Sequence, residues 1–221
     1  MRDRSSYQPP GASANGADYA KTFLRRAHNL VGRGYANLIP AQFACAEEET
    51  ITGELVQAVE TVLDDARAPR WMRWFSIHED PRVQDPARQG KRRLKLDIRI
   101  DSSQNWPRAR LHFEAKRLGS NHGISVYLGS EGIQRFLEGR YAHDDAFAGM
   151  LGYVQQGQPD EWGTRIEQHM KSHAKNLCLR PSGCWHREKL LPGPSATYRS
   201  AHDRPTVGKP IEIFHTLLLF N

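Results

Sequence analysis

Three charged residues on two neighbouring stretches of the chain have the types and spacing of a metal-binding site. Glu114 and Lys116 are two residues apart in the segment 108–116, and Asp97 lies in the segment 93–101. Carboxylate oxygens suit hard divalent cations, and Mg²⁺ commonly takes one or two of them together with water and phosphate oxygens. A lysine beside such a site can orient a water molecule or offset the charge of a phosphate. The chemistry that these residues indicate is the metal-assisted attack of water on a phosphodiester.

Both segments alternate between apolar and polar side chains, which is typical of strands with one buried face. The apolar positions are Leu94, Leu96, Ile98 and Ile100 in the first segment, and Leu111, Phe113 and Ala115 in the second. The polar residues 102–107 between them predict an antiparallel hairpin with its turn centred on residues 104–105. That pairing places Asp97 opposite residue 112 or 113, with Glu114 one diagonal step away on the same polar face.

The segments around this hairpin predict a mixed α/β fold. Residues 47–65 carry apolar side chains at helical spacing and end before Pro69, so they predict a helix. The other predicted elements are a strand over 70–78, a helix over 130–142, a strand over 148–155, a helix over 160–173 capped by Asp160, and a terminal strand over 211–220. Residues 177–210 are predicted to be rich in loops.

Length and composition indicate a globular chain with one main domain. The 221 residues are 38% hydrophobic and 25% charged, with a formal net charge of +6 that is compatible with an anionic partner. No apolar run approaches the ~18 residues of a membrane-spanning helix. The first six residues lack the apolar core of a secretory signal and three cysteines are few for a disulfide framework, so we expect a cytoplasmic protein. Residues 1–18 are predicted to be a flexible leader, followed by a single domain over 19–221.

The predicted hairpin resembles the PD-(D/E)xK signature of restriction-endonuclease-like nucleases. The matching residues are Leu96-Asp97 and Glu114-Ala115-Lys116, with Leu96 at the position of the signature's proline. That superfamily has an α-β-β-β-α-β core around a mixed central sheet, and the predicted elements match it over about 47–155. The resemblance makes 156–221 a C-terminal elaboration of helix and strand. It implies an Mg²⁺- or Mn²⁺-dependent endonuclease that hydrolyses DNA, in prokaryotic restriction or antiphage defence.

The resemblance also implies roles for individual residues. Asp97 and Glu114 would hold the metal, and Lys116 would be the catalytic lysine. A glutamate of the first core helix often joins them, and Glu54 is the expected catalytic and metal-binding residue because it lies about 60° from the apolar stripe of that helix. Two lesser candidates lie at similar angles: Glu47 and Glu48.

Basic residues cluster around the predicted site and would attract a phosphate backbone. They are Arg93, Lys95, Arg99, Arg108, Arg110 and Arg117. Arg135 and Gln134 can also reach a phosphate, but a solvated helix face is the simpler interpretation. DNA is the expected partner. Whether a second copy of the chain or another subunit supplies recognition or NTPase activity stays open, because the sequence has no Walker motif.

Two alternatives stay open from the sequence. In the first, the hairpin is an ordinary solvent-exposed face on which Glu114 and Lys116 pair with neighbouring charges, and the protein is a non-catalytic nucleic-acid-binding or assembly subunit that retains the nuclease fold. The second concerns zinc, for which the candidate ligands are Cys178, Cys184 and His186. The five-residue gap between these cysteines does not fit the usual spacing of zinc ligands.

Overall fold

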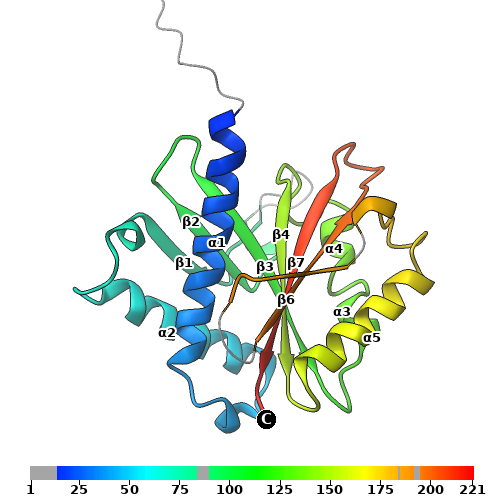
Figure 1. The fold of residues 1–221 in the computed structure, drawn as a ribbon, viewed down its shortest axis with the longest axis horizontal. Coiled ribbons are helices and arrows are strands. Elements are labelled where there is room, and N and C mark those ends of the chain that lie inside the picture. Colours follow the sequence, from blue (N-terminus) through cyan, green and yellow to red (C-terminus); the bar gives the residue numbers. More distant parts are fainter. Residues whose placement is uncertain (1–13, 84–89, 184, 192–194) are drawn as a thin grey trace, which may run out of the picture.

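The computed structural model describes residues 14–83, 90–183, 185–191 and 195–221, which contain one seven-stranded sheet (Figure 1). The strand order is β1-β2-β3-β4-β7-β6-β5. The strands are β1 (Phe75–Glu79), β2 (Ile98–Ser102), β3 (Ala109–Leu118), β4 (Phe147–Val154), β5 (His186–Glu188), β6 (Ala196–His202) and β7 (Ile211–Leu219). Neighbours pair in parallel at β3–β4 and β4–β7 and antiparallel elsewhere. The fold is therefore α/β with a mixed sheet, as the sequence predicts.

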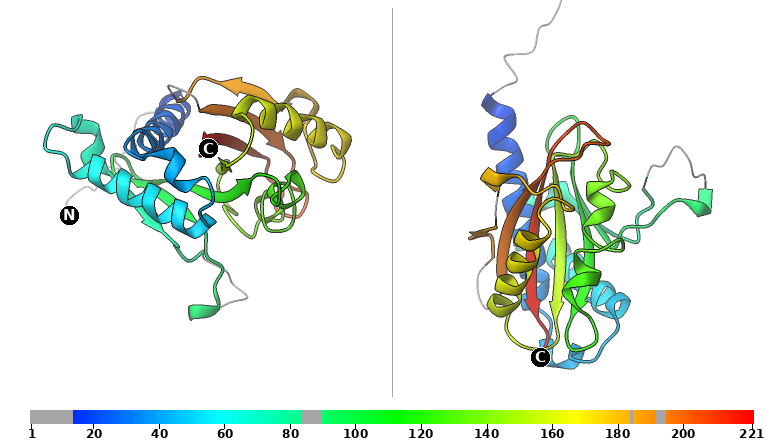
Figure 2. Two further views of the ribbon diagram at one scale, coloured as in Figure 1. Left: turned by 90° about the horizontal axis from the view of Figure 1, so that it is seen from below. Right: turned by 90° about the vertical axis from the view of Figure 1, so that its right-hand side faces the viewer.

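Helices cover both faces of the sheet (Figure 2). The α-helices are α1 (Ala14–Ala36), α2 (Glu48–Asp64), α3 (Ile124–Tyr127), α4 (Gln134–Leu137) and α5 (Pro159–Ser172). Four short 3-10 helices complete the described elements: η1 (Pro40–Phe43), η2 (Arg70–Trp74), η3 (Gly90–Arg92) and η4 (Pro181–Gly183). Among the described helices, none combines the length and the apolar character that crossing a bilayer requires.

Two apolar clusters, one on each face, bury the central strands. Side chains of α1 and α2 pack against Phe113 and Ala115 of β3. Side chains of α3, α4 and α5 pack with Met150 of β4 and Leu217 of β7 in the second cluster. Because β3 is covered from both sides, its polar face is also buried: Glu114 is only 1% exposed and Lys116 only 8%. The interpretation of this hairpin as an ordinary solvent-exposed face is therefore wrong.

The predicted helices and strands over 47–65, 108–116, 148–155, 160–173 and 211–220 are confirmed within about two residues as α2, β3, β4, α5 and β7. The N-cap of α5 differs from the prediction. Gln158 takes that position and forms a capping box with Glu161, while Asp160 accepts a hydrogen bond from the Tyr198 hydroxyl. The Asp160 side chain bonds to a residue far away in the chain, so it does not cap its own helix.

The N-terminal prediction is wrong from Ala14 onward, because α1 begins inside the predicted leader over 1–18; residues 1–13 lie outside the described part of the chain. The apolar residues Leu24, Ala27 and Val31 recur at helical spacing within a polar sequence and are buried. Gly34 allows α1 to approach α2, since a Cβ there would lie 2.4 Å from Val59 Cγ2. Packing against α2 therefore stabilises a helix that the composition of the segment did not predict.

Two other predicted elements are shorter than expected, and one predicted loop region contains strands. Residues 70–74 of the predicted strand over 70–78 form η2, and only the remainder joins β1. The predicted helix over 130–142 is reduced to α4, since Gly132 is pressed against the Tyr127 carbonyl, where a Cβ would lie at 2.1 Å. The predicted loop region 177–210 contains β5 and β6, and β6 is buried through its pairing with β7.

The predicted strand over 93–101 divides at Asp97. Only β2 joins the sheet, whereas Leu94 and Leu96 bond to Val83 and Pro81 of the preceding segment. These two leucines pack with the second apolar cluster instead of sharing a face with Ile98. The described residues 80–83 and 90–97 therefore form a projection from the sheet, which we call the arm (Figure 2).

Histidines buried in the core make the stability of this fold sensitive to acid. His28, His202 and His215 are all 0% exposed. Burial lowers the pKa of His28 and of His202 to about 4, although each ring also donates a hydrogen bond to a carbonyl oxygen. Burial likewise lowers the pKa of His215 well below its ordinary value. All three side chains are therefore neutral in the folded protein at neutral pH.

We expect the free energy of unfolding to decrease as the pH falls from 6.5 towards 4. In this range the histidines take up protons in the unfolded chain, whereas in the folded protein their lowered pKa keeps them neutral. Each such histidine contributes a slope of up to about 1.4 kcal/mol per pH unit. Urea denaturation at pH 7, 6 and 5 measures this slope. The exposed His186 supplies a control, since His186→Gln removes a histidine outside the core and should leave the slope unchanged. A free energy of unfolding that is constant from pH 7 to 5 would contradict the prediction.

Candidate active site

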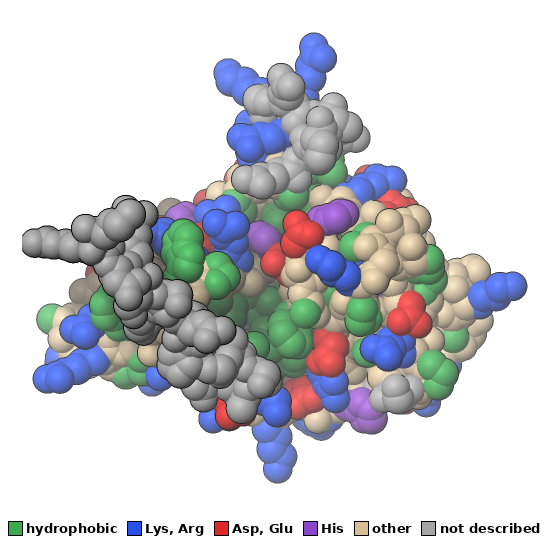
Figure 3. All heavy atoms as spheres, turned by 90° about the horizontal axis from the view of Figure 1, so that it is seen from above, with side chains coloured by type: hydrophobic (Ala, Val, Ile, Leu, Met, Phe, Trp, Pro, Cys, Tyr) green, Lys and Arg blue, Asp and Glu red, His purple; other side chains and the backbone are tan. Residues whose placement is uncertain are grey.

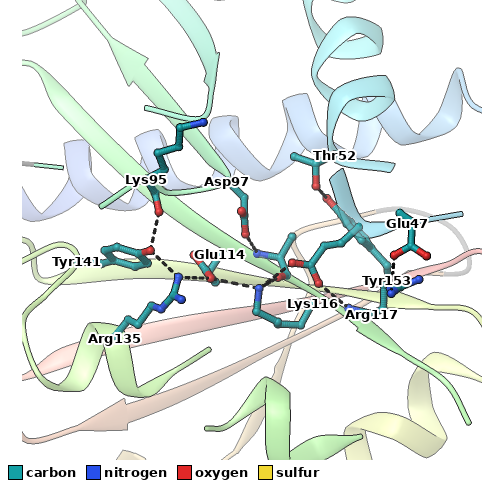
Figure 4. A network of polar contacts seen from close by, with 12 residues as sticks. Glu47, Thr52, Lys95, Asp97, Glu114, Lys116, Arg117, Arg135, Tyr141 and Tyr153 are labelled. Atoms are coloured by element: carbon teal, nitrogen blue, oxygen red, sulfur yellow. Dashed lines mark hydrogen bonds and ion pairs between the residues drawn. The ribbon is translucent and has the colours of Figure 1, made fainter. Parts of the chain in front are cut away.

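The sheet brings the three predicted chemical groups together at the base of the arm (Figure 4). Ile98 of β2 pairs with Phe113 of β3, so Asp97 lies one residue beyond the last pair, opposite Glu114. The predicted register, with Asp97 opposite residue 112 or 113, is thus wrong by one to two residues, because the turn is centred one residue later. The predicted convergence of Asp97, Glu114 and Lys116 is confirmed.

Hydrogen bonds and ion pairs fix each of these side chains. The Lys116 ammonium donates to Glu48 Oε1 at 2.7 Å and to the carbonyl oxygen of Ala115 at 2.6 Å. The same Nζ atom lies 3.2 Å from Glu114 Oε1. Asp97 Oδ2 accepts a hydrogen bond from the backbone N–H of Ala115 at 2.6 Å. The site is therefore a connected network in which Lys116 bridges two carboxylates.

The helix carboxylate in this network is Glu48 and not Glu54. Glu48 is the first residue of α2, and its Oε2 also accepts the backbone N–H of Arg117 at 3.2 Å. Its neighbour Glu47 pairs with the Arg117 guanidinium at 2.7 Å. Glu54 is exposed and lies six residues further along, which on an α-helix is about 9 Å along the axis and about 120° around it. The helix meets β3 with its N-terminal end, so only the first-turn glutamates reach the site.

Two further residues complete the site from the α4 side. Arg135 Nη1 donates to Glu114 Oε1 at 3.0 Å and to the Tyr141 hydroxyl at 2.6 Å. That hydroxyl in turn donates to the carbonyl oxygen of Lys95 at 2.5 Å. The expected solvated helix face is therefore wrong for Arg135, whose side chain is 25% exposed and paired. Sequence reasoning missed Tyr141, which the predicted helix over 130–142 includes, because the helix ends at Leu137 and the irregular segment that follows turns this side chain towards Arg135.

Burial dominates the electrostatics of the carboxylates. Burial, reinforced by the negative charge of Asp97, raises the pKa of Glu114 to about 8, although Lys116 and Arg135 oppose this shift. Burial also raises the pKa of Asp97 above its ordinary value. Glu114 Oε2 is buried and has no hydrogen-bond partner among the described residues. An unpartnered buried oxygen is costly and marks a position where a ligand is expected.

Lys116 remains a cation in this environment. Burial by itself would lower its pKa, but the charges of Glu114, Glu48 and Asp97 outweigh burial and raise the pKa above its ordinary value. At neutral pH the side chain is therefore an ammonium group. It can donate hydrogen bonds and offset negative charge, but it holds its proton too firmly to act as a general base.

The donor set fits a hard cation with few protein ligands. Asp97 and Glu114 offer carboxylate oxygens, including the unpartnered Glu114 Oε2, and Mg²⁺ commonly binds through one or two carboxylates. Within the described residues, no group of three or more His, Cys, Asp or Glu side chains is arranged to hold a metal. Within the described residues, a complete set of protein ligands for a metal is therefore absent, also around Cys178 and His186. Cys184 lies outside the described residues.

The predicted nucleic-acid-binding residues fall into two groups. Arg99, Lys95 and Arg117 form ion pairs with Asp101, Asp80 and Glu47. Arg108 and Arg110 are exposed near the start of β3, and Arg93 is half-buried on the arm. Basic side chains also gather at the end of the arm (Figure 3), where Lys91 and Arg92 are exposed. The exposed cations therefore lie on the arm, where Lys95 is also paired, and at the start of β3, whereas Arg99 and Arg117 are partly buried in their ion pairs.

We expect Glu114→Gln to stabilise the metal-free protein increasingly as the pH rises from 4.5 to 8, because in this range the wild-type carboxyl must take up a proton when the chain folds, whereas glutamine is neutral in both states. The difference in the free energy of unfolding should reach on the order of a few kcal/mol at pH 8. Denaturation in EDTA measures it, with the exposed Glu138→Gln as control. Parallel pH profiles for wild type and Glu114→Gln would contradict the burial of this charge. Added Mg²⁺ should stabilise the wild type more than the variant.

No protein-family model, curated protein or solved structure matches this chain. The functional assignment therefore depends on the geometry and electrostatics of the site. The residues that carry it are Asp97, Glu114 and Lys116, with Glu48 and Arg135 bound to them.

Proposed function

We propose that this protein is an Mg²⁺- or Mn²⁺-dependent nuclease that hydrolyses phosphodiester bonds of DNA. The observation that carries the proposal is the buried Glu114 carboxylate, which has one unpartnered oxygen beside Asp97 and Lys116. A structural ion pair would satisfy both carboxylate oxygens, because leaving one without a partner is costly. A divalent cation would satisfy that oxygen and relieve the repulsion between Glu114 and Asp97.

The chain's own residues have separate tasks in this reaction. Asp97 and Glu114 would hold the ion, which when bound supplies Lewis-acid stabilisation of the phosphoryl oxygens. Lys116 keeps its proton at Nζ and offsets the charge that develops on the phosphate. Glu48 holds this ammonium at 2.7 Å and so fixes its direction. The Ala115 N–H fixes the Asp97 carboxylate at 2.6 Å.

The order of elements supports a restriction-endonuclease-like core. From α2 the chain continues through β1, β2 and β3, then α3 and α4, and returns to the sheet as β4 beside β3. This is the α-β-β-β-α-β order that the resemblance implies, with Glu114 and Lys116 on the third strand. The endonuclease activity on DNA, the defence role, the cytoplasmic location and a partner or second copy for recognition belong to the same proposal.

The second candidate is a non-catalytic nucleic-acid-binding or assembly subunit that retains this fold. One observation favours it: Lys116 and Arg135 already neutralise the Glu114 and Glu48 carboxylates. In such a subunit the network would stabilise the sheet and bind no metal. Cleavage assays separate the two candidates directly.

The test is cleavage of plasmid, single-stranded DNA and RNA with Mg²⁺, Mn²⁺, Ca²⁺ or EDTA. We expect cleavage of DNA with Mg²⁺ or Mn²⁺ and none in EDTA. Lys116→Ala and Asp97→Asn should each reduce the cleavage rate by at least about 100-fold, since each removes stabilisation specific to the transition state. Undiminished activity in EDTA, or wild-type rates for either variant, would overturn the assignment.

The affinity for DNA in EDTA, where no cleavage is expected, shows whether a substitution affects binding or only the reaction. Asp97→Asn should bind DNA as tightly as the wild type, or up to about five-fold more tightly, because one of the carboxylates that repel the phosphate is neutralised. The logarithm of affinity should fall linearly with the logarithm of salt concentration. A variant that loses both binding and cleavage would indicate a structural role for Asp97.

A paired substitution on α2 tests which glutamate serves the site. We expect Glu48→Gln to reduce cleavage by about 10-fold or more, because the Lys116 ammonium loses its charged partner at 2.7 Å. Glu54→Gln should cleave at the wild-type rate, because Glu54 is exposed on another side of the helix. The reverse result would restore Glu54 as the helix carboxylate of the site.

A further inference from the structure

Two cations compete for one oxygen of Glu114. Glu114 Oε1 lies 3.2 Å from Lys116 Nζ and 3.0 Å from Arg135 Nη1. Lys116 has Glu48 as a second carboxylate partner, at 2.7 Å. Arg135 pairs with no other carboxylate among the described residues, so Glu114 is its charge partner there. If a divalent cation took Glu114, Arg135 would lose this ion pair and keep only the more distant negative charge of Glu131.

The structure also holds Arg135 by a neutral contact that does not depend on Glu114. Arg135 Nη1 donates to the Tyr141 hydroxyl at 2.6 Å, and that hydroxyl donates onward to the Lys95 carbonyl, so its orientation is fixed. The guanidinium therefore stays tethered at the base of the arm even if it leaves Glu114.

Most of the guanidinium remains available for another acceptor. Both described hydrogen bonds of Arg135 use Nη1, and its other nitrogens bond to no described residue. The side chain is 25% exposed, so those donors are accessible. A planar guanidinium with free donors matches two oxygens of one phosphate. The acceptor that fits both the chemistry and the place is a phosphodiester beside Glu114.

We propose that Arg135 exchanges partners: it neutralises Glu114 in the metal-free protein, and when a divalent cation takes Glu114 it binds the phosphodiester of the substrate. This inference rests on the proposed function for the identity of the substrate. Its first step concerns only the metal and Glu114, and it can be tested without any cleavage. Arg135 thereby becomes a substrate-binding residue of the site rather than a structural ion pair.

The first measurement is the affinity for Mn²⁺, read by electron paramagnetic resonance of the free ion. Arg135→Gln should bind Mn²⁺ at least about five-fold more tightly than the wild type, because a cation 3.0 Å from Glu114 no longer opposes the metal. Arg135→Lys should fall between them, because lysine keeps the positive charge but, with its shorter side chain and single nitrogen, does not hold that charge in the position of the guanidinium beside Glu114. Arg140→Gln is the matched control, since Arg140 is exposed and pairs with Glu138.

The second measurement is the affinity for a non-hydrolysable phosphorothioate dinucleotide in saturating Mn²⁺. Arg135→Gln should bind this probe about 10-fold more weakly than wild type, and Arg140→Gln should bind it equally well. Tighter Mn²⁺ binding together with weaker probe binding is the signature of partner exchange. A residue that only stabilised the fold would weaken both.

Each failure has a distinct meaning. Unchanged or weaker Mn²⁺ binding by Arg135→Gln overturns the exchange, and unchanged probe binding overturns the phosphate contact. A wild type that binds Mn²⁺ but cleaves no nucleic acid overturns the nuclease proposal while the Mn²⁺ result still decides the exchange. If Arg135→Gln does not fold, as thermal denaturation would show, Arg135→Lys carries the same two measurements with the same expected directions.

Discussion

The burial of the Glu114 carboxylate is the constraint around which the rest of this site is arranged. A charge that is 1% exposed must be neutralised, protonated or bound by a cation, and the surroundings offer all three solutions. Lys116 and Arg135 approach one oxygen, the pKa is raised to about 8, and the other oxygen has no described partner. The position is therefore satisfied only in part by the protein, which is what a binding site for a cation requires.

The unpartnered Glu114 oxygen lowers the stability of the fold, and apolar packing on both faces of β3 compensates for this loss. β3 carries Glu114 between two apolar clusters, so hydrophobic packing on both faces holds the strand in place while its polar residues remain strained electrostatically. Glu48 and Tyr141 each hold one of the two cations beside Glu114, the first Lys116 and the second Arg135. Removing the buried charge should consequently stabilise the protein and abolish its chemistry, the usual trade between stability and activity.

The position of the arm connects this site to its proposed substrate. The arm begins and ends at the sheet, where Asp97 and the Lys95 carbonyl belong to the network, and it carries exposed cations at its far end. A nucleic acid drawn to those cations would pass the base of the arm, where Arg135 retains free donors. In the proposed function, the same segment would supply both a metal ligand, Asp97, and a basic surface for the phosphate backbone. The arm has this place because the chain leaves the sheet at Asp97 instead of continuing β2.

The sequence by itself determined the α/β class, the order of the core elements and the meeting of Asp97, Glu114 and Lys116. Alternation on two strands joined by a short turn leaves few ways to arrange those residues. Tertiary structure alone decided the burial of their polar face, because alternation does not reveal which helices cover it. It also selected Glu48 over Glu54, which depended on where the first turn of α2 meets β3. It brought to the site Arg135 from α4 and Tyr141 from the irregular segment after α4. These contacts join residues far apart in the chain, so the pattern of neighbouring residues does not predict them.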